Sequence, residues 1–334
     1  MNILAIRFAR LGDVVLLVPA LSSLKRSFPN ARLTLLTGHR CAPIAELCPA
    51  IDEVLAVNRV AMRDGPVLTA LQDMTRLVRD VRRRRFDVVI DFHSFRETNL
   101  LAWSSGAPVR IGMKRSDSPY LKFCFNRPPI PEDKALHVAK MFQKIIEGVF
   151  SGTPSPCPLP GGEGFVIPDE LTLWANQIAS NKLRLALYID APVSERIWPP
   201  ERFAALADFA IEYLGATPIV ITSQQGHDLV KRVQHASRNA DQIGVFTDLT
   251  IPQLAALIAS ARLFVSNDTG PMHLGPAMGV QTLGLFSVGY PEHFRPIGPN
   301  DKFLRANPIE KIETEEVVAV VEEMWTIADR GLQC

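Results

Sequence analysis

The amino-terminal stretch from residue 3 to residue 21 reads ILAIRFARLGDVVLLVPAL. It opens with the short apolar run Ile3-Leu4-Ala5-Ile6, which is typical of a strand buried on both faces. A polar turn at residues 10–13 follows, and residues 14–28 then repeat apolar side chains at helical spacing until Pro29. A second strand at residues 32–36 completes a β-α-β unit, whose crossover we expect to be right-handed.

The alternation of strand and helix patterns continues through the rest of the chain. Further strands are predicted at residues 52–57, 87–91, 109–113, 183–189, 217–222, 242–246, 263–266 and 282–286. Helices are predicted at residues 66–84, 135–149, 171–181, 201–214, 228–235, 252–261, 272–278 and 312–328. Residues 154–164, rich in proline and glycine, interrupt this rhythm and are the best candidate for a linker. We therefore predict the α/β class, with two Rossmann-like parallel-sheet domains at residues 1–160 and 161–334.

Composition limits the classes to which the protein can belong. A length of 334 residues suggests two domains, and 47% hydrophobic with 21% charged residues is ordinary for a globular protein. Lys and Arg number 36 and Asp and Glu 35, so the net charge of +1 argues against a dedicated nucleic-acid-binding protein. The sequence shows no signal peptide and no membrane-spanning run, and its five scattered cysteines fit a reducing compartment. We expect a cytoplasmic monomer that can dock at the inner face of the cytoplasmic membrane.

Loops that follow strands are the places to search for a site, because open parallel sheets bind ligands at the carboxyl ends of their strands. After the first strand, Gly12 permits a tight turn or the close approach of a ligand. The next residue, Asp13, has two interpretations. It is either the N-cap of the following helix or a general base aimed at a substrate.

A second polar run follows the strand at residues 263–266. Asp268, Thr269 and Gly270 lead into a helix that begins with a proline and carries His273. Free N–H groups at such a helix N-terminus favour a phosphate group, and Asp268 can accept hydrogen bonds from sugar hydroxyls. The alternative is that Asp268 or Thr269 caps the helix while His273 lies in the core.

Two further segments follow strands. Ser194 and Arg196 come after the strand at 183–189, and an arginine can bind a phosphate through two hydrogen bonds. Trp198 is expected to pack in the core. In the first domain, the run from Asp91 to Arg96 includes His93 and offers polar groups to a substrate.

Basic residues are frequent in the predicted loops and element ends of the first domain. They either face an anionic acceptor or are ordinary solvated surface: Arg10, Arg59, Arg63, Arg96, Lys114 and Arg115. The run from Arg82 to Arg85 is expected to be a solvated helix end.

Several familiar motifs are missing. The sequence has no GxxxxGK[ST] phosphate-binding loop, no GxGxxG after the first strand and no GxSxG nucleophile turn. It also has no Asp-x-Asp pair to hold a metal ion between diphosphate oxygens. We therefore predict neither a metal site nor a cofactor.

The chain resembles bacterial glycosyltransferase family 9, the ADP-heptose lipopolysaccharide heptosyltransferases. Residues 3–21 are similar to that family's opening signature, in which Gly-Asp precedes an apolar helix with Pro-Ala-Leu. Residues 268–274, read as Asp-Thr-Gly-Pro-Met-His-Leu, resemble the family's Asp-[Ser/Thr]-Gly-x-x-His-Leu. Residues 196–199 stand where the family has Lys-x-Trp-Pro, and His137 opens a helix as in the family. Residues 190–194 and the arginine at position 196 depart from the family pattern.

The resemblance implies a GT-B fold, in which two Rossmann-like domains face each other across a cleft. It implies an inverting, metal-independent transfer of a sugar, heptose in this family, from ADP-heptose to a lipopolysaccharide-core or related surface glycan. In that reaction Asp13 is the catalytic base. The donor is expected at Ser194, Arg196, Asp268, Thr269, Gly270 and His273. The glycolipid acceptor is expected at Arg10, Arg59, Arg63, His93, Arg96, Lys114 and Arg115.

Two other functions fit the same architecture. One is a nucleotide-sugar epimerase, although that enzyme has no need of a base after the first strand. The other is a non-catalytic protein that binds a nucleotide sugar, which the altered segment at residues 190–194 keeps open. Hydrolysis of the donor with and without an acceptor distinguishes the three.

Overall fold

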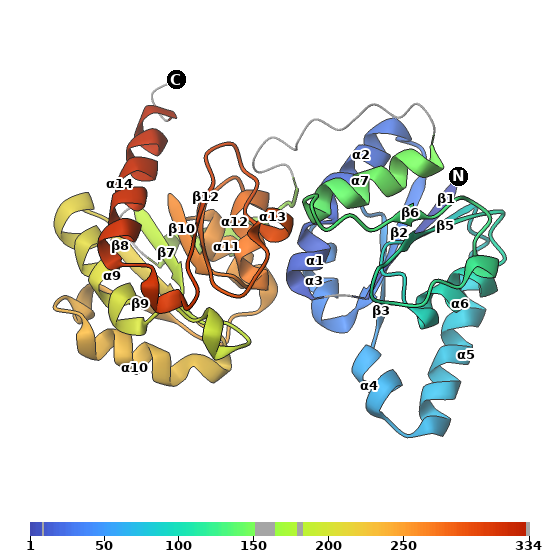
Figure 1. Ribbon diagram of the computed structural model, residues 1–334, viewed down its shortest axis with the longest axis horizontal. Coiled ribbons are helices and arrows are strands. Elements are labelled where there is room, and N and C mark those ends of the chain that lie inside the picture. Colours follow the sequence, from blue (N-terminus) through green and yellow to red (C-terminus); the bar gives the residue numbers. More distant parts are fainter. Residues whose placement is uncertain (9, 151–163, 179–182, 332–334) are drawn as a thin grey trace. The chain divides into compact units, whose positions relative to one another are not determined.

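A computed structural model describes residues 1–8, 10–150, 164–178 and 183–331, without the side chains of residues 62–64 and 328–331 (Figure 1). The chain divides into two compact units, Met1–Leu159 and Pro160–Cys334. Except for Gly164, the predicted linker at 154–164 lies outside the described residues. Within the part of the chain that the structure describes, no helix combines the length and the apolar character needed to span a membrane.

Unit 1, residues 1–159, is built on a parallel sheet of six strands in the order β3-β2-β1-β4-β5-β6. These strands are β1 (Asn2–Arg7), β2 (Arg32–Gly38), β3 (Glu53–Val57), β4 (Val88–Asp91), β5 (Val109–Lys114) and β6 (Ile130–Pro131). In the middle of the sheet, Ala5 pairs with both Leu35 and Ile90. Both neighbours run parallel to β1, and Ile3 to Ile6 are fully buried, as the apolar run predicts for a strand covered on both faces.

The helices of unit 1 include two that replace a single predicted one. The α-helices that the structure describes in unit 1 are α1 (Leu11–Val15), α2 (Val18–Ser27), α3 (Ala42–Ala45), α4 (Arg59–Asp64), α5 (Val67–Arg83), α6 (Arg96–Ser104) and α7 (Val138–Val149). The prediction of one helix over residues 14–28 was wrong at its start and in its interior, whereas its end agrees with that of α2 at Ser27. Helix formation already begins at Leu11, and it is interrupted before Val18 because Pro19 lacks an N–H and crowds the preceding turn.

Unit 2, residues 160–334, repeats the plan with the order β12-β11-β10-β7-β8-β9. Its strands are β7 (Arg184–Tyr188), β8 (Thr217–Ile221), β9 (Gly244–Phe246), β10 (Leu263–Asn267), β11 (Gln281–Phe286) and β12 (Lys302–Arg305). Its α-helices are α8 (Asp169–Gln177), α9 (Pro200–Leu214), α10 (His227–Ala236), α11 (Ile251–Ala259), α12 (Leu274–Ala277), α13 (Pro291–Phe294) and α14 (Thr314–Gly331). The predicted α/β class is therefore confirmed in both units.

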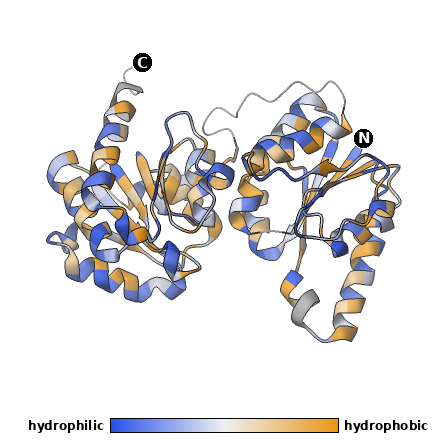
Figure 2. Ribbon diagram, in the orientation of Figure 1, coloured by the Kyte–Doolittle hydropathy of each residue, from blue (hydrophilic) through white to orange (hydrophobic). Residues whose placement is uncertain are grey.

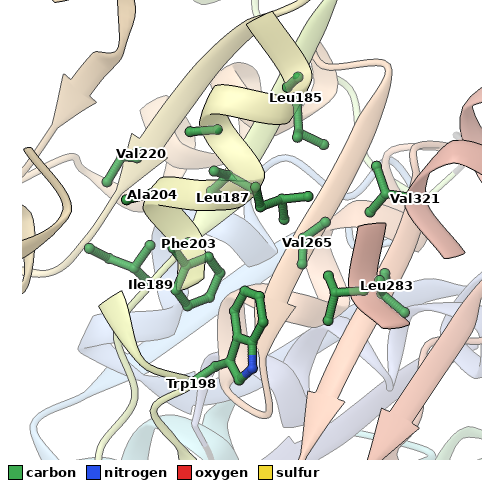
Figure 3. Close-up of a cluster of buried hydrophobic side chains, with 14 of the residues drawn as sticks. Leu185, Leu187, Ile189, Trp198, Phe203, Ala204, Val220, Val265, Leu283 and Val321 are labelled. Atoms are coloured by element: carbon green, nitrogen blue, oxygen red, sulfur yellow. The ribbon is translucent and has the colours of Figure 1, made fainter. Parts of the chain in front are cut away.

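The core of unit 2 lies between its sheet and the helices α9 and α14. Leu187, Val265 and Leu283 come from neighbouring strands, and Val321 comes from α14 (Figure 3). Trp198 closes one end of this cluster and is fully buried, with its ring edge-on to Phe203 at 4.9 Å. Its indole nitrogen donates a hydrogen bond of 2.8 Å to the Ile312 carbonyl, so Trp198 packs in the core as expected.

Candidate active site

Both sheets contain a point at which the strand order reverses, and polar side chains gather there. In unit 1 the chain crosses from β3 to β4, on the other side of β1. In unit 2 it crosses from β9 to β10, on the other side of β7. Ligands of such sheets bind beyond the carboxyl ends of the two central strands. We call these places the unit 1 site, after β1 and β4, and the unit 2 site, after β7 and β10.

An ion pair occupies the centre of the unit 1 site. The Nη2 atom of Arg7 lies 2.5 Å from Oδ1 of Asp13, and Nη1 donates to the Phe92 carbonyl at 2.6 Å. Arg7 is 5% exposed, and its guanidinium lies 4.9 Å from the centre of the Phe142 ring. Asp13 keeps about a quarter of its side chain exposed, at 24%. The buried arginine therefore holds a carboxylate that solvent and ligands can reach.

Asp13, one candidate for the N-cap, stands instead in the first turn of α1, three residues past the observed N-cap. The N-cap of α1 is Arg10, whose side chain makes no capping hydrogen bond. Gly12 belongs to the helix and is buried, so the first of its two interpretations, a tight turn, was wrong. Because the side chain of Asp13 turns to Arg7, capping does not explain this aspartate.

A tight turn after β4 positions His93. The Asp91 carboxylate accepts hydrogen bonds from the backbone N–H groups of His93 and Ser94, at 3.0 and 2.8 Å. The side-chain amide of Asn99 donates to the same carboxylate at 3.0 Å. Ser94 has a positive φ of 52°, which lets the chain reverse within these residues. Burial raises the pKa of Asp91 to about 6, although these hydrogen bonds favour its charged form.

The imidazole of His93 is buried with its hydrogen-bonding groups unused. It is 4% exposed, and neither ring nitrogen has a hydrogen-bond partner among the described residues. Its ring lies between Phe8 and Phe95, with centroid distances of 5.8 and 4.5 Å. Burial lowers the pKa of His93 to about 2, and the charges of Arg7, Arg59 and Arg115 act in the same direction. The imidazole is therefore neutral at physiological pH.

The structure brings some of the predicted acceptor-binding residues together around His93. Arg59, the first residue of α4, donates to the Phe8 carbonyl at 3.2 Å and lies 3.8 Å from Glu97. The guanidinium of Arg115 lies 4.8 Å from the centre of the Phe95 ring and donates to Asp117 at 2.9 Å. Arg59 and Arg115 are thus held against Phe8 and Phe95, the two residues whose rings contact His93.

The remaining predicted acceptor residues are placed less closely. Arg10, Arg96 and Lys114 are exposed and stand at the carboxyl ends of β1, β4 and β5. They share the edge of the sheet with Asp13. The side chain of Arg63 lies outside the described residues.

A second ion pair forms the unit 2 site. Nη1 of Arg196 lies 3.1 Å from Oδ2 of Asp268, and the same atom is 3.4 Å from the Asp268 carbonyl. Burial raises the pKa of Asp268, and the charge of Arg196 opposes this shift. The Nε atom of Arg196 is buried and has no hydrogen-bond partner in the described part of the chain. This arginine therefore has donor capacity left for an anion.

Two side chains that sequence reasoning missed hold Arg196 in place. Asn267, fully buried at the end of β10, donates to the Ile189 carbonyl at 2.9 Å and accepts from the Trp198 N–H at 3.1 Å. It therefore anchors both ends of the loop that carries Arg196. The Ser287 hydroxyl, just after β11, donates to the Glu195 carbonyl. Neither residue type is unusual in a loop, and only the pairing of distant segments shows what they do.

Gly289 makes the space that Asp268 occupies. A Cβ atom at Gly289 would lie 2.1 Å from Oδ2 of Asp268, far inside the contact distance of two such atoms. The carboxylate that meets Arg196 therefore lies directly against the backbone of the loop after β11. No sequence signal marks this glycine, because it is required by a side chain from another strand.

The other predicted donor residues lie around this ion pair with different exposure. Ser194 is exposed and its hydroxyl contacts Glu195 at 3.2 Å. Thr269 and Gly270 are half-buried, and His273 is buried. The predicted helix at 272–278 is instead a 3₁₀ turn, Gly270–His273, followed by the single turn of α12. So short a helix carries a weaker dipole toward an anion than the predicted one.

Asp190, the acidic residue after β7, is engaged in local hydrogen bonds. Its carboxylate accepts from the Ala191 N–H at 2.8 Å and from the Ser223 hydroxyl. These bonds tie it to the end of β8. Among the described residues, no three His, Cys, Asp or Glu side chains gather in a way that could hold a metal ion.

Comparison with known proteins gives a consistent picture. A model of glycosyltransferase family 9 (heptosyltransferase) matches residues 74–322. Lipopolysaccharide heptosyltransferase 2 of Escherichia coli is 21% identical over 316 residues, which cover 91% of this chain and 88% of that protein.

Solved structures agree in fold. A glycosyl transferase family 9 structure from Veillonella parvula has a TM-score of 0.84 at 23% identity and covers 97% of both chains. An Escherichia coli heptosyltransferase with ADP-2-deoxy-2-fluoro heptose has a TM-score of 0.78 at 18% identity, over 97% of this chain and 99% of that chain. These likenesses confirm the predicted GT-B fold.

Proposed function

The chain belongs to glycosyltransferase family 9 (heptosyltransferase), and on this premise we propose that it transfers heptose from ADP-heptose to a lipopolysaccharide-core or related surface glycan. The transfer inverts the anomeric carbon and uses no metal ion or other cofactor. Unit 1 binds the acceptor and unit 2 binds the donor. The enzyme acts as a monomer at the inner face of the cytoplasmic membrane, where a glycolipid acceptor is held.

The observation that carries this proposal is the Arg7–Asp13 pair at the strand reversal of unit 1. In an inverting transfer a general base removes the proton of the attacking hydroxyl as its oxygen bonds to the anomeric carbon. Asp13 is a partly exposed carboxylate at the place where ligands of such sheets bind. Arg7 orients the Asp13 carboxylate, and Arg7 is itself held by the Phe92 carbonyl and by the Phe142 ring.

Departure of the nucleoside diphosphate builds negative charge on the leaving phosphate oxygens. Arg196 is the charged donor of the unit 2 site, and its Nε–H is available in addition to the group that meets Asp268. A guanidinium in this position stabilises the leaving group in the absence of a metal ion. Asp268 then accepts hydrogen bonds from sugar hydroxyls, with Ser194, Thr269, Gly270 and His273 around the same ligand.

The surroundings of His93 suit an anionic acceptor. Three cations, Arg7, Arg59 and Arg115, lie close enough to lower the pKa of this imidazole, although each also meets a carboxylate. His93 remains neutral there, and its buried ring nitrogens, one a donor and one an acceptor, have no partner among the described residues that would compete with a sugar hydroxyl. Arg10, Arg96 and Lys114 at the same edge of the sheet are proposed to bind the same acceptor, and Arg63, whose side chain lies outside the described residues, is retained with them.

The decisive experiment supplies purified protein with ADP-heptose and with core glycans of stepwise length. A heptosylated product with inverted anomeric configuration, identified by mass spectrometry and NMR, is the expected result. Release of heptose or a changed sugar without any acceptor would instead indicate hydrolysis or epimerisation. Thermal stabilisation by a panel of nucleotide sugars identifies the donor independently, because a ligand at a hundred times its Kd adds about 2.7 kcal/mol.

A further inference from the structure

The first two turns of α5 carry apolar side chains that do not reach the core of unit 1. Val67, Leu68 and Leu71 are 76%, 71% and 59% exposed. The same helix joins the core only further along, at Leu77 and Val81. Figure 2 shows hydrophobic positions at the beginning of α5, where the helix leaves the α4–α5 connection. Several large apolar side chains exposed at one place indicate an interaction surface.

The other end of the same helix is strongly basic. Arg79, Arg82, Arg83 and Arg85 line one shallow groove, together with Thr75 and Val78. None of these four arginines has an ion-pair partner in the described ranges. The neighbouring Arg76 and Arg84, by contrast, meet Asp73 and Glu53. Four guanidinium groups that face one groove without counter-charges attract an anionic surface.

Helical geometry places these two features on one side of α5. At 3.6 residues per turn, Leu68, Leu71, Thr75, Arg79 and Arg82 lie along one stripe. Along the helix axis, the two leucines lie roughly 20 Å from Arg82 and Arg83, from the rise of 1.5 Å per residue. We call this stripe, with Arg83, the α5 face. An apolar end that enters acyl chains and a basic end that meets phosphate groups match the interface of a bilayer.

We propose that the α5 face docks unit 1 on an anionic lipid bilayer. A nucleic acid would meet the arginines but leave the leucines in water. An apolar protein partner would cover the leucines but leave the arginines without counter-charge. A bilayer rich in acidic headgroups satisfies both ends of the stripe at once.

The position of this face gives the docking its use, and this step rests on the proposed function. Arg59 of α4 donates a hydrogen bond to the carbonyl of Phe8, the residue that follows β1. The helix pair is thus tied to the edge of the sheet that carries Asp13, and the apolar start of α5 lies next to α4. Docking through this end brings the unit 1 site to the level of the headgroups. A sugar acceptor anchored in the bilayer carries its hydroxyl at that level.

Sedimentation with vesicles tests the proposal on the intact chain. We expect binding to vesicles of phosphatidylglycerol and phosphatidylethanolamine, and at least tenfold weaker binding to phosphatidylcholine. Leu68→Ser/Leu71→Ser should weaken binding about tenfold, because the buried apolar area is lost. Arg79→Gln/Arg82→Gln/Arg83→Gln should weaken it about a hundredfold, since each basic residue contributes about a factor of five. Leu173→Ser, also exposed on a helix, and Lys231→Gln/Arg232→Gln are matched controls that should bind as the parent protein does.

Three results would overturn the proposal. They are equal binding to charged and neutral vesicles, unchanged binding of both α5 variants, and a dimer that the leucine variant dissociates while vesicles remain unbound. Transfer to a water-soluble, delipidated acceptor separates this proposal from the proposed function. The α5 variants should retain that activity in full. If the parent protein binds vesicles but transfers no sugar, the proposed function fails and the docking surface stands.

Discussion

The guanidinium of Arg196 and the carboxylate of Asp268 meet at 3.1 Å, although 72 positions separate them in the chain. One residue comes from the loop after β7 and the other from the end of β10, the two strands between which the order of the sheet reverses. Arg196 is thus held beside a carboxylate that, in our proposal, accepts hydrogen bonds from sugar hydroxyls. The same pair gives opposite expectations for binding of diphosphate and binding of sugar.

We predict that Arg196→Ala weakens binding of ADP, because a charge-assisted contact to diphosphate contributes roughly 1.5–3 kcal/mol. Asp268→Asn should leave affinity for ADP unchanged or higher while it weakens ADP-heptose, since only the sugar meets this side chain. Isothermal titration calorimetry with both ligands measures the difference. The exposed Arg232→Ala is the control, and unchanged affinity of Arg196→Ala for ADP would place the diphosphate elsewhere.

Gly289→Ala should damage the donor site through a steric effect. Its Cβ atom would lie 2.1 Å from Oδ2 of Asp268, and such overpacking costs about 1–3 kcal/mol. The cost should fall sharply in the Asp268→Ala background, where the opposing atom is gone. Gly38→Ala is the matched control, because no atom lies within 4 Å of its added methyl group. Additive effects of Gly289→Ala and Asp268→Ala on donor affinity would refute the contact.

Asp13→Asn should reduce transfer by a factor on the order of 10² to 10⁴, the usual loss when a general base is removed. Affinity for ADP-heptose should stay within about twofold, because the proposed donor site belongs to unit 2. Rapid-quench assays and calorimetry measure the two quantities separately. Near-parental turnover would remove Asp13 from the mechanism.

His93 gives unit 1 a predictable dependence on pH. Its pKa is lowered from 6.5 to about 2 in the folded state, so only the unfolded chain takes up this proton as the pH falls below 6.5. The free energy of unfolding should therefore fall on acidification by at most about 1.4 kcal/mol per pH unit from this residue. His93→Gln should remove that slope. Urea denaturation at several pH values between roughly 7.5 and roughly 5 measures this slope.

The contribution of Asp91 to stability changes with pH in the opposite direction, and both the parent protein and His93→Gln contain this residue. Its folded pKa is raised to about 6, so its contribution to stability decreases as the pH rises from the usual carboxyl value to 6. The comparison of His93→Gln with the parent therefore cancels it. Identical slopes of stability against pH would mean that His93 is not neutral in the folded protein.

Removal of divalent metal should leave transfer intact. The proposal assigns the diphosphate charge to Arg196 and to the N–H groups near Thr269 and Gly270, without a carboxylate pair that would bind Mg²⁺. Initial rates in excess EDTA should equal those in buffer alone. Activity that disappears with EDTA and returns with Mg²⁺ or Mn²⁺ would sink this assignment.

The sequence predicted well those features that depend on local order. Apolar runs such as residues 3–6 specify buried strands, and their alternation with helical patterns specifies two parallel sheets. Helix boundaries next to proline were predicted less accurately. A break before Pro19 divides the predicted helix into α1 and α2, and α1 already begins at Leu11, so Gly12 and Asp13 lie in a helix and not in the predicted turn.

The candidate site was predictable only in part, for a physical reason. Asp13, Arg196 and Asp268 follow strands, and the order of strand and helix already places such residues at one edge of a sheet. Arg7 was missed as a site residue because an arginine at a strand end has no local signal, although here its partners are Asp13 and Phe142.

By itself, then, the sequence determined the fold class, the family resemblance and the loops in which the chemistry lies, since these follow from periodicity and short motifs. Only the tertiary structure decided which side chains meet. The side chain of Asn267 forms hydrogen bonds with both Ile189 and Trp198, and the absence of a side chain at Gly289 leaves room for the Asp268 carboxylate. Contacts of this kind depend on the register of separate strands and on packing at van der Waals distance, and neither is written in the order of neighbouring residues.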